Sequence, residues 1–262
     1  MFFDSHCHID PETYGGDAGA DAVVATAKAA GVRWMLTVGS GYGDGSAARA
    51  VAVAKRHEGV WASVGVHPHD ATVLDEAVLA RLVALAGEPE VVAFGEMGLD
   101  FYYDNSPRDI QRDAFRRQIQ AALALDLPII IHDRDSDGEC FDILRDESAF
   151  DGAGVLYHCY AGDLEQMHSI VDAGGYISIP GVVTFKKSTL TQAVAAATPL
   201  ERLLIETDAP FLTPEPLRGR RNEPCHVALT GEYVAGLREM TTEALAAATA
   251  ENTARLLRIS LE

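Results

Sequence analysis

The chain opens with Met1-Phe2-Phe3-Asp4-Ser5-His6-Cys7-His8, and this stretch guides the interpretation of everything after it. Two apolar residues run directly into a His-x-His pair, a pattern that predicts a short buried strand whose carboxyl end opens into a site. Residues i and i+2 of a strand point to the same side, so His6 and His8 can direct both imidazoles at one point. A divalent metal uses that geometry. Taken alone, the stretch also fits a surface loop with two unrelated histidines.

Short apolar segments of the same kind recur along the chain, separated by segments with helical patterns. None shows the alternation of a half-exposed sheet, which is typical of parallel strands buried on both faces. With Phe2–His6, the predicted strands are Val32–Val38, Val60–Gly65, Val91–Gly95, Pro128–His132, Gly154–His158, Gly175–Ile179 and Leu203–Glu206. This alternation predicts a single (β/α)8 barrel.

The helical segments carry recognisable start signals. Thr72–Asp75 resembles a capping box ahead of a helix over Glu76–Ala86. Ser106-Pro107 predicts a cap residue followed by proline at the first helical position, before a helix with one apolar face. That face comprises Ile110, Ala114, Ile119, Ala122 and Leu123. The other predicted helices are Ser46–Arg56, Leu164–Ala173, Gln192–Ala197 and, closing the chain as two amphipathic helices, Ala228–Glu239 and Glu243–Leu257.

Composition sets the bounds of this interpretation. The 262 residues are 48% hydrophobic and 23% charged, an ordinary globular balance, and no linker divides them, so we expect one domain over residues 1–262. A doubly wound open sheet is the structural alternative, without support for dinucleotide binding because no Gly-x-Gly-x-x-Gly follows an early strand. With no apolar leader and scattered cysteines, we expect a cytoplasmic protein without a membrane segment, a signal peptide or disulfides. Cys7 and Cys159, each beside a histidine, are interpreted as packing residues.

Polar residues collect at the carboxyl ends of the predicted strands, where barrel enzymes keep their active sites. Four histidines with Glu96 and Asp208 at one barrel mouth would be costly to desolvate without cations. We expect one metal to be held by His6, His8 and Asp208 and a second by His132 and His158, with Glu96 as a bridge. About three protein ligands per metal leave room for water and substrate.

An ordered set of motifs spans nearly the whole chain and resembles the TatD family of metal-dependent hydrolases, within the amidohydrolase-like barrel superfamily. The motifs are Asp4–His8, Gly65–His69, Gly95–Asp100, Ile129–Arg134, His158–Tyr160, Thr184–Lys186, Glu206–Pro210 and Arg218–Pro224. The resemblance implies a barrel, two divalent cations (Mg²⁺, Mn²⁺ or Zn²⁺), phosphodiester hydrolysis of the metal-dependent DNase type, and the same six ligands. Met97, Tyr160-Ala161 and Ile179-Pro180-Gly181 depart from the usual family residues, and the last two leave substrate specificity open.

The interpretation that follows is two-metal hydrolysis of a phosphodiester, in an exonuclease-like manner. Glu96 would hold the metals together and Asp208 would accept the proton of the attacking water, which makes these two the candidate catalytic residues. The candidate substrate-binding residues are His67, His69, Arg134, Lys186, Arg218, Arg220 and Arg221. For Arg134 a salt bridge to Asp133 or Asp135 is the alternative, and for the arginine run a solvated loop. Phe101, Tyr102 and Tyr103 could stack on a base or simply cover the mouth.

The charge of the chain limits the kinds of nucleic acid that it could bind. The net charge is −18, which disfavours tight binding to long duplex DNA, although residues 186–221 carry six basic against four acidic residues, a net of +2. We therefore expect strand ends or short oligonucleotides as substrate, no membrane partner, and a monomer in preference to an oligomer.

Two rival functions remain at this point. One is a glutamate-bridged ester or lactone hydrolase or a D-aminoacyl-tRNA deacylase. The related carboxylated-lysine sites are disfavoured because all four lysines (Lys28, Lys55, Lys186 and Lys187) lie outside the predicted strands. The other is a non-catalytic metal- or partner-binding barrel, which six intact ligands with open coordination positions argue against.

Overall fold

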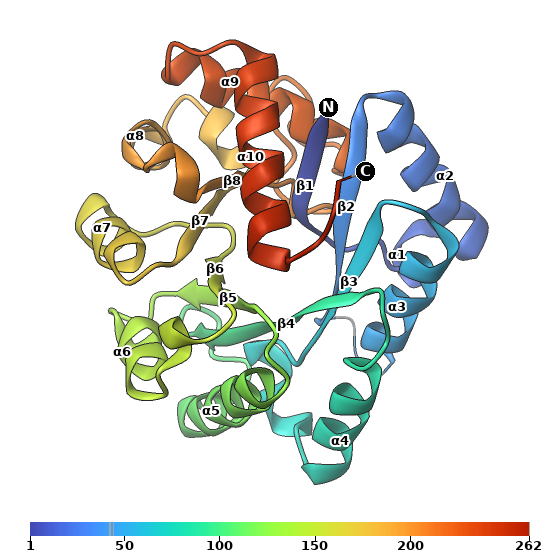
Figure 1. The fold of residues 1–262 in the computed structure, drawn as a ribbon, viewed down its shortest axis with the longest axis vertical. Helices are drawn as coiled ribbons and strands as arrows, with labels where there is room; N and C mark the ends of the chain where they lie inside the picture. Colours follow the sequence, from blue (N-terminus) through green and yellow to red (C-terminus); the bar gives the residue numbers. More distant parts are fainter. Residues whose placement is uncertain (42, 44, 262) are drawn as a thin grey trace.

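Eight parallel strands form one sheet in which each strand pairs with the next along the chain, and the sheet curls into a TIM barrel (Figure 1). We describe residues 1–41, 43 and 45–261 of a computed structural model. The strands are β1 Phe2–Cys7, β2 Val32–Gly39, β3 Val60–Val64, β4 Val91–Asp100, β5 Ile129–Arg134, β6 Val155–Tyr157, β7 Tyr176–Ile179 and β8 Leu203–Ile205. The predicted fold class is confirmed, and the predicted strands match these within a few residues except at β4.

Helices surround the barrel. They are α1 Pro11–Tyr14, α2 Asp17–Ala29, α3 Ser46–Arg56, α4 Glu76–Leu85, α5 Arg108–Ala124, α6 Glu139–Asp146, α7 Leu164–Asp172, α8 Thr189–Ala197, α9 Val227–Leu237 and α10 Thr242–Leu257. Short 3₁₀ segments are η1 Pro68–Val73, η2 Ala149–Asp151, η3 Gly181–Thr184, η4 Leu200–Arg202 and η5 Pro224–His226. The helices α9 and α10 confirm the two predicted C-terminal helices, and α10 packs on β1 and β8.

Two predicted helix caps are wrong, although the predicted start of α4 at Glu76 is correct. Thr72 belongs to η1, and the side chain that caps α4 is that of Asp75, which accepts a hydrogen bond from the Val78 amide. The Ser106 hydroxyl donates to the backbone oxygen of His69, so α5 has no side-chain cap and begins one residue after Pro107. Asp75 bonds the backbone of α4 in place of Thr72, and Ser106 bonds the backbone of His69 in place of the first turn of α5.

The buried interior at the amino ends of the strands is apolar. One cluster joins a residue from most strands, namely Phe3, Leu36, Val92, Ile130, Leu156, Tyr176 and Leu204, to Ala250, Leu256 and Leu257 of α10. Such a layer fills this half of the barrel, as in other barrels whose interiors are packed cores. The histidines and carboxylates of the predicted site lie at the opposite mouth.

The seam between β1 and β8 is closed by polar groups. Asp4 is fully buried, and its carboxylate accepts hydrogen bonds from the Thr207 amide at 2.9 Å and hydroxyl at 2.5 Å. One step further along, the Asp208 amide donates to the His6 carbonyl at 2.9 Å. The first strand and the residues after the last strand are thereby held together where two predicted ligands lie.

Strand β4 runs five residues beyond its predicted end, and two glycines shape this extension. Gly95 and Gly98 have φ values of +133° and +146°, in the range that side chains other than hydrogen strongly disfavour. A Cβ on Gly98 would lie 1.9 Å from the His132 carbonyl oxygen. The strand pairing shifts register between Phe94 and Met97. The glycines thus let β4 continue closely beside β5 while Glu96 is buried at the mouth.

Two buried glutamines on α5 hold the loops that border the mouth. The Gln118 amide group bonds both the N–H and the C=O of Val66, and Gln111 does the same for Asp100. The predicted apolar face of this helix is correct for Ala114, Ile119 and Ala122, whereas Ile110 is exposed. Sequence periodicity could not reveal the glutamines because they are polar residues in core positions.

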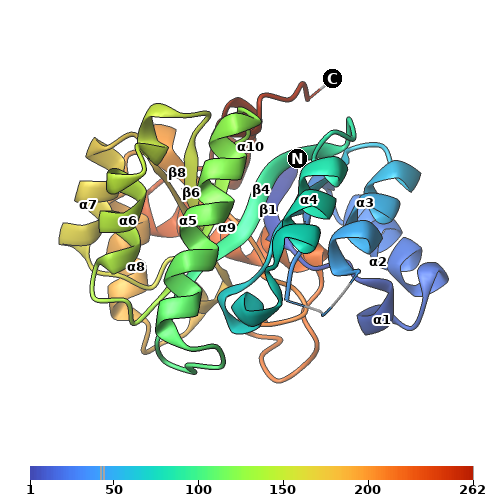
Figure 2. The ribbon, with the colours of Figure 1, turned by 90° about the horizontal axis from the view of Figure 1, so that it is seen from below.

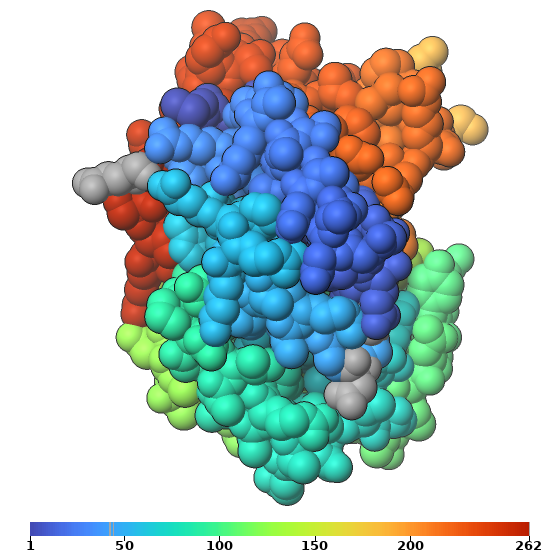
Figure 3. Space-filling view, turned by 90° about the vertical axis from the view of Figure 1, so that its right-hand side faces the viewer, coloured from blue at the N-terminus to red at the C-terminus, as the bar shows by residue number. Residues whose placement is uncertain are grey.

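The two faces of the barrel differ in what they carry. Turned by 90°, the molecule shows both chain termini on one side and the loop after β8 (orange) on the other (Figure 2). In the space-filling view of the side that lies to the right in Figure 1, the N-terminal third of the chain (blue to teal) covers most of the surface (Figure 3). Among the residues described, no helix has the length and apolar character needed to span a membrane.

Candidate metal centre

The side chains of His6, His8 and Asp208 meet at the carboxyl end of β1. The two Nε2 atoms lie 3.4 Å apart, and Asp208 Oδ1 lies 3.8 Å from that of His6 and 3.5 Å from that of His8. The ligand atoms of these residues form one of three groups of potential metal donors among the residues described. A tetrahedral ion with bonds of 2.0–2.1 Å has ligand atoms about 3.3 Å apart, so the spacing suits one cation.

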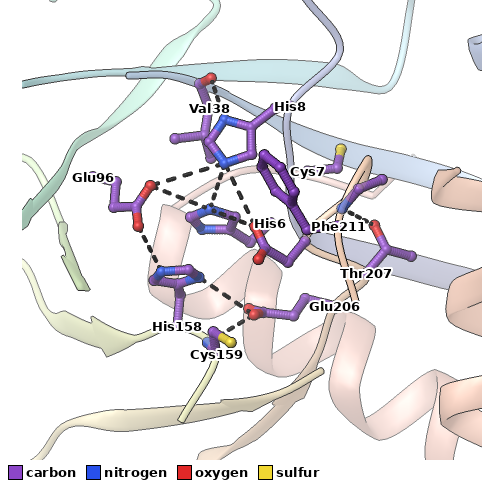
Figure 4. Close-up of polar contacts among 12 residues, drawn as sticks. His6, Cys7, His8, Val38, Glu96, His158, Cys159, Glu206, Thr207 and Phe211 are labelled. Atoms are coloured by element: carbon purple, nitrogen blue, oxygen red, sulfur yellow. Dashed lines mark hydrogen bonds and ion pairs between the residues drawn. The ribbon is translucent and has the colours of Figure 1, made fainter. Parts of the chain in front are cut away.

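Glu96 extends this group and begins a second one (Figure 4). Its Oε2 lies 3.7 Å from His6 Nε2 and 3.9 Å from His8 Nε2. Its Oε1 faces the other way, 2.6 Å from His158 Nε2 and 2.9 Å from His132 Nδ1. One buried carboxylate therefore presents a different oxygen to each of two sets of imidazoles.

The structure adds His67 to the second set. Its Nε2 lies 3.5 Å from Glu96 Oε1 and 3.3 Å from His132 Nδ1, and the three residues form another of the donor groups. From the sequence, His67 was expected to contact substrate phosphate or to support the metal ligands, and not to be a metal donor itself. Pro68 follows His67 at the first position of η1 and turns the chain there. This proline was the sequence feature from which the position of His67 could have been predicted.

Groups behind the imidazoles orient them. His8 Nδ1 lies 3.2 Å from the Val38 carbonyl, and His132 Nε2 lies 3.1 Å from Asp100 Oδ2, which also contacts His69 at 2.8 Å. His158 Nδ1 lies 3.4 Å from Glu206 Oε1. Metal-ligating histidines almost always direct their second nitrogen at such a carboxylate or carbonyl. The supporting roles of Asp100 and Glu206 were not predicted, although both lie in the motifs at the ends of β4 and β8.

The charge states of these groups follow from burial and from one another. Burial would raise the pKa of Glu96, but the surrounding imidazoles, His158 foremost, hold it well below its usual value. Burial, reinforced by the charge of His158, lowers the pKa of His6 well below the ordinary value, so His6 is neutral. Burial also opposes protonation of His158, yet Glu96 and Glu206 raise its pKa well above normal. The metal-free site thus contains a carboxylate anion, which would bind a divalent cation, and a proton on His158, which the cation would displace.

A cavity of about 520 Å³ opens over these donors, and we name it the mouth cavity. Its lining includes the predicted substrate residues His67, His69 and Arg134. The Arg134 guanidinium lies over the rings of Tyr102 and Tyr103, 4.2 and 4.7 Å from their centroids, and forms no ion pair among the described residues. The predicted alternative of a salt bridge to Asp133 or Asp135 is therefore wrong.

Three other expectations are settled by position. Cys7 is buried in the core, as expected, but Cys159 lies beyond the end of β6 with φ +45° and lines the mouth cavity, so its assignment as a packing residue is wrong. Phe101 is partly buried beneath Arg108 and Arg112 and is not in the cavity lining. The strand alternation used for Cys159 did not apply because the strand ends two residues earlier.

The other predicted basic residues lie outside the mouth cavity. Arg218 lies over Phe185 at 4.4 Å, and Arg221 lies over Tyr14 at 4.8 Å. Lys186 and Arg220 are exposed. All of them are on the loops after β7 and β8, so the structure does not bring them together with the metal donors.

The fold and donors can be compared with known proteins. A family model described as TatD related DNase matches residues 3–258. The metal-dependent hydrolase YabD of Bacillus subtilis, itself uncharacterized, is 42% identical over 260 residues, 99% of this chain and 100% of that protein. A protein of Cronobacter turicensis named 3'-5' ssDNA/RNA exonuclease TatD is 40% identical over 245 residues, 92% of each chain. The crystal structure of YjjV, a TatD homologue of Escherichia coli, aligns with a TM-score of 0.90 at 29% identity, covering 99% of this chain and 98% of that one.

Proposed function

Because the chain belongs to the TatD-related DNase family of metal-dependent hydrolases, we propose that it hydrolyses phosphodiester bonds at the ends of single-stranded nucleic acids with two divalent cations. The observation that carries this proposal is the Glu96 carboxylate, whose oxygens face two separate sets of imidazoles. This arrangement suits a carboxylate shared by two cations. His6, His8 and Asp208 would hold one cation and His132 and His158 the other, with Glu96 shared and His67 close to the second.

When bound, the cations would supply a water of lowered pKa and neutralise charge that develops on the phosphoryl oxygens. The protein supplies the remaining functions. Asp208 is 13% exposed at its side chain, which leaves its free oxygen open to the cavity as the acceptor for the proton of the attacking water. Arg134, held over two tyrosine rings, offers a fixed planar guanidinium that binds a phosphate in a bidentate manner.

Several features favour single strands over duplexes. The net charge of −18 disfavours long polyanions, and the mouth cavity of about 520 Å³ suits a ligand of nucleotide size. Tyr103 and Phe211, 55% and 52% exposed, line this cavity and offer faces on which unpaired bases can stack. The Cronobacter relative is named a 3'-5' ssDNA/RNA exonuclease, and we extend that polarity to this chain as part of the proposal.

The test is an activity panel with Mg²⁺, Mn²⁺, Zn²⁺ and Co²⁺ against single- and double-stranded DNA, RNA, bis(p-nitrophenyl) phosphate and several lactones. We expect metal-dependent release of mononucleotides from single strands. His6→Ala and Asp208→Ala should abolish it while the circular dichroism spectrum is retained, and His168→Ala, at an exposed position of α7, should not change it. Full activity in both ligand variants, or hydrolysis of lactones only, would overturn the proposal.

The arginines after β8 are proposed to contact the phosphate backbone beyond the cleaved bond. Arg220→Ala/Arg221→Ala should raise KM for a 12-mer single strand several-fold and leave bis(p-nitrophenyl) phosphate unchanged. Lys28→Ala/Arg33→Ala removes the same charge from exposed positions on α2 and β2 and serves as the matched control. An equal rise of KM for both substrates would refute the backbone contact.

A further inference from the structure

A second hollow opens beside the metal centre, and we name it the side cavity. Its volume is about 620 Å³, and it lies between the segments that follow β5 and β6. Asp133, Arg134, His158 and Ala161 line both the side cavity and the mouth cavity, so the two adjoin at a candidate metal ligand and at the candidate phosphate-binding arginine. Its size is that of a pocket for a small organic ligand.

Carboxylates dominate the side cavity. Its lining includes Asp133, Asp135, Asp137, Asp142, Asp163 and Glu165. The only lysine or arginine among the lining residues is Arg134, at the border with the mouth cavity. The basic residues Lys186, Arg218, Arg220 and Arg221 line neither cavity and lie on the loops after β7 and β8. The surface next to the metal centre is therefore divided into a side that repels phosphate and a side that attracts it.

The carboxylates do not form a chelating site for one metal ion. Among the residues described, no three donor atoms of the side cavity come as close together as those of the metal centre. The walls also contain the rings of Phe141, Tyr157 and Tyr160 and the amide of Gln166. Dispersed acceptors, aromatic faces and an amide suit a neutral molecule with several hydroxyl and amino donors. A nucleoside has that character, and carboxylates are used elsewhere to bind ribose hydroxyls.

An unused polar group in the wall supports an organic occupant. Tyr157 is 1% exposed, and its hydroxyl has no hydrogen-bond partner among the described residues. Buried hydroxyls are nearly always hydrogen-bonded, and an exception in a native protein needs an explanation. A ligand in the side cavity would supply the missing partner once it displaces the groups that cover this hydroxyl.

Resting on the proposed nuclease function, we propose that the side cavity binds the terminal nucleoside of the strand and selects ends that carry a free 3'-hydroxyl over ends that carry a 3'-phosphate. A strand placed this way keeps its phosphates toward Arg134 and the basic loops. Water then adds to the phosphorus between the last two nucleosides, the bond from phosphorus to the preceding O3' breaks, and that oxygen takes up a proton. The products are a nucleoside 5'-monophosphate and a shortened strand that again ends in a 3'-hydroxyl.

The charge effect is large enough to measure. A carboxylate about 8 Å from a terminal phosphate of charge near −2 disfavours binding by roughly twofold at 0.1 M salt. The lining carboxylates together should therefore give a preference of at least about tenfold in kcat/KM for the 3'-hydroxyl end. Neutralising three of them should reduce this preference by on the order of eightfold, and 0.5 M salt should reduce it as well.

The experiment compares two otherwise identical single-stranded 8-mers, one with a 3'-hydroxyl and one with a 3'-phosphate, in the metal-loaded protein. The test variant is Asp135→Asn/Asp142→Asn/Glu165→Gln. Asparagine is tolerated at position 135, where φ is +54°. The control variant is Asp172→Asn/Glu232→Gln/Glu251→Gln, which removes equal charge from exposed positions that line neither cavity. Bis(p-nitrophenyl) phosphate, which has no terminal nucleoside, reports on the metal centre alone.

Support requires that the wild-type protein and the control variant prefer the 3'-hydroxyl strand, and that the test variant loses most of this preference by gaining activity on the 3'-phosphate strand. Equal rates on both strands in the wild-type protein would overturn the inference while leaving the nuclease function intact. A preference that persists unchanged in the test variant would also overturn it. Failure to cleave either strand, with bis(p-nitrophenyl) phosphate cleaved, would instead reject the nucleic-acid substrate itself.

The variant Tyr157→Phe tests the inference independently. Its KM for the 3'-hydroxyl strand should rise about two- to tenfold, which corresponds to the loss of one hydrogen bond.

Discussion

Replacing Glu96 by Gln is the most informative change to the metal centre, because one carboxylate serves both donor sets. Oε1 lies 2.6 to 3.5 Å from three imidazole nitrogens and Oε2 lies 3.7 and 3.9 Å from two more. Gln keeps the shape but removes the charge and one of the two acceptor oxygens. Both cations should therefore bind more weakly in this variant.

The size of the effect can be bounded. Loss of a group that merely orients a ligand costs about 10- to 100-fold in metal affinity. In the proposed centre Glu96 is a direct donor, so we expect a loss of at least 100-fold at each site, which corresponds to about 2.7 kcal/mol per ion. Asp208→Asn changes a donor of the first set only. It should weaken one ion by a similar factor and leave the other within a few-fold of the wild-type affinity.

Isothermal titration of the metal-free protein with Mn²⁺ or Zn²⁺ measures both the number of ions and their affinities. We expect two ions in the wild-type protein, one retained in Asp208→Asn, and none at micromolar metal in Glu96→Gln. Two tightly bound ions in Glu96→Gln would refute the assignment of Glu96 as the shared ligand. The same stoichiometry in both variants would refute the division into two donor sets.

Three further predictions concern the surroundings of the centre. Asp100→Asn should lower the affinity of the second cation about 10- to 100-fold, because Asp100 orients His132; titration with Mn²⁺ measures this. Metal affinity should fall as the pH is lowered, since the raised pKa of His158 makes protons compete with the cation. In the metal-free protein, protonated His158 stabilises the fold through Glu96 and Glu206, so stability should fall as the pH rises through that pKa. Urea denaturation at several pH values, with and without metal, separates this loss of stability from the pH dependence of metal binding. Asp4→Ala should destabilise the protein by about 3 kcal/mol in urea denaturation, since it leaves the buried Thr207 amide and hydroxyl without their acceptor.

The barrel was predictable from the sequence because its signal is repeated in every unit. Each buried strand is a short apolar run, and polar residues follow the strands at the same end. The six donors were identified by that rule alone, and the structure brings them together. Their roles as ligands remain a prediction of the sequence that the geometry favours.

Positions that depend on local irregularity were not predictable. Strand β4 was expected to end at Gly95, but Gly95 and Gly98 permit a close approach to β5 and the strand continues to Asp100. Cys159 was placed by strand alternation beyond the point where the strand ends. The buried Gln118 is satisfied by both backbone groups of Val66, a contact across 52 residues that no local pattern encodes.

The seam between β1 and the residues after β8 ties metal capture to the completion of the chain. His6 and Asp208 meet only when β1 has joined the residues that follow β8. During synthesis, a chain that still lacks its final strand cannot assemble the first donor set and so has no means of retaining that cation. In the closed barrel, the proposed ion would join segments about 200 residues apart in sequence, so its binding energy would add to the global stability and not to that of one loop. Hydrolytic capacity and a fully closed barrel would then be acquired in the same step.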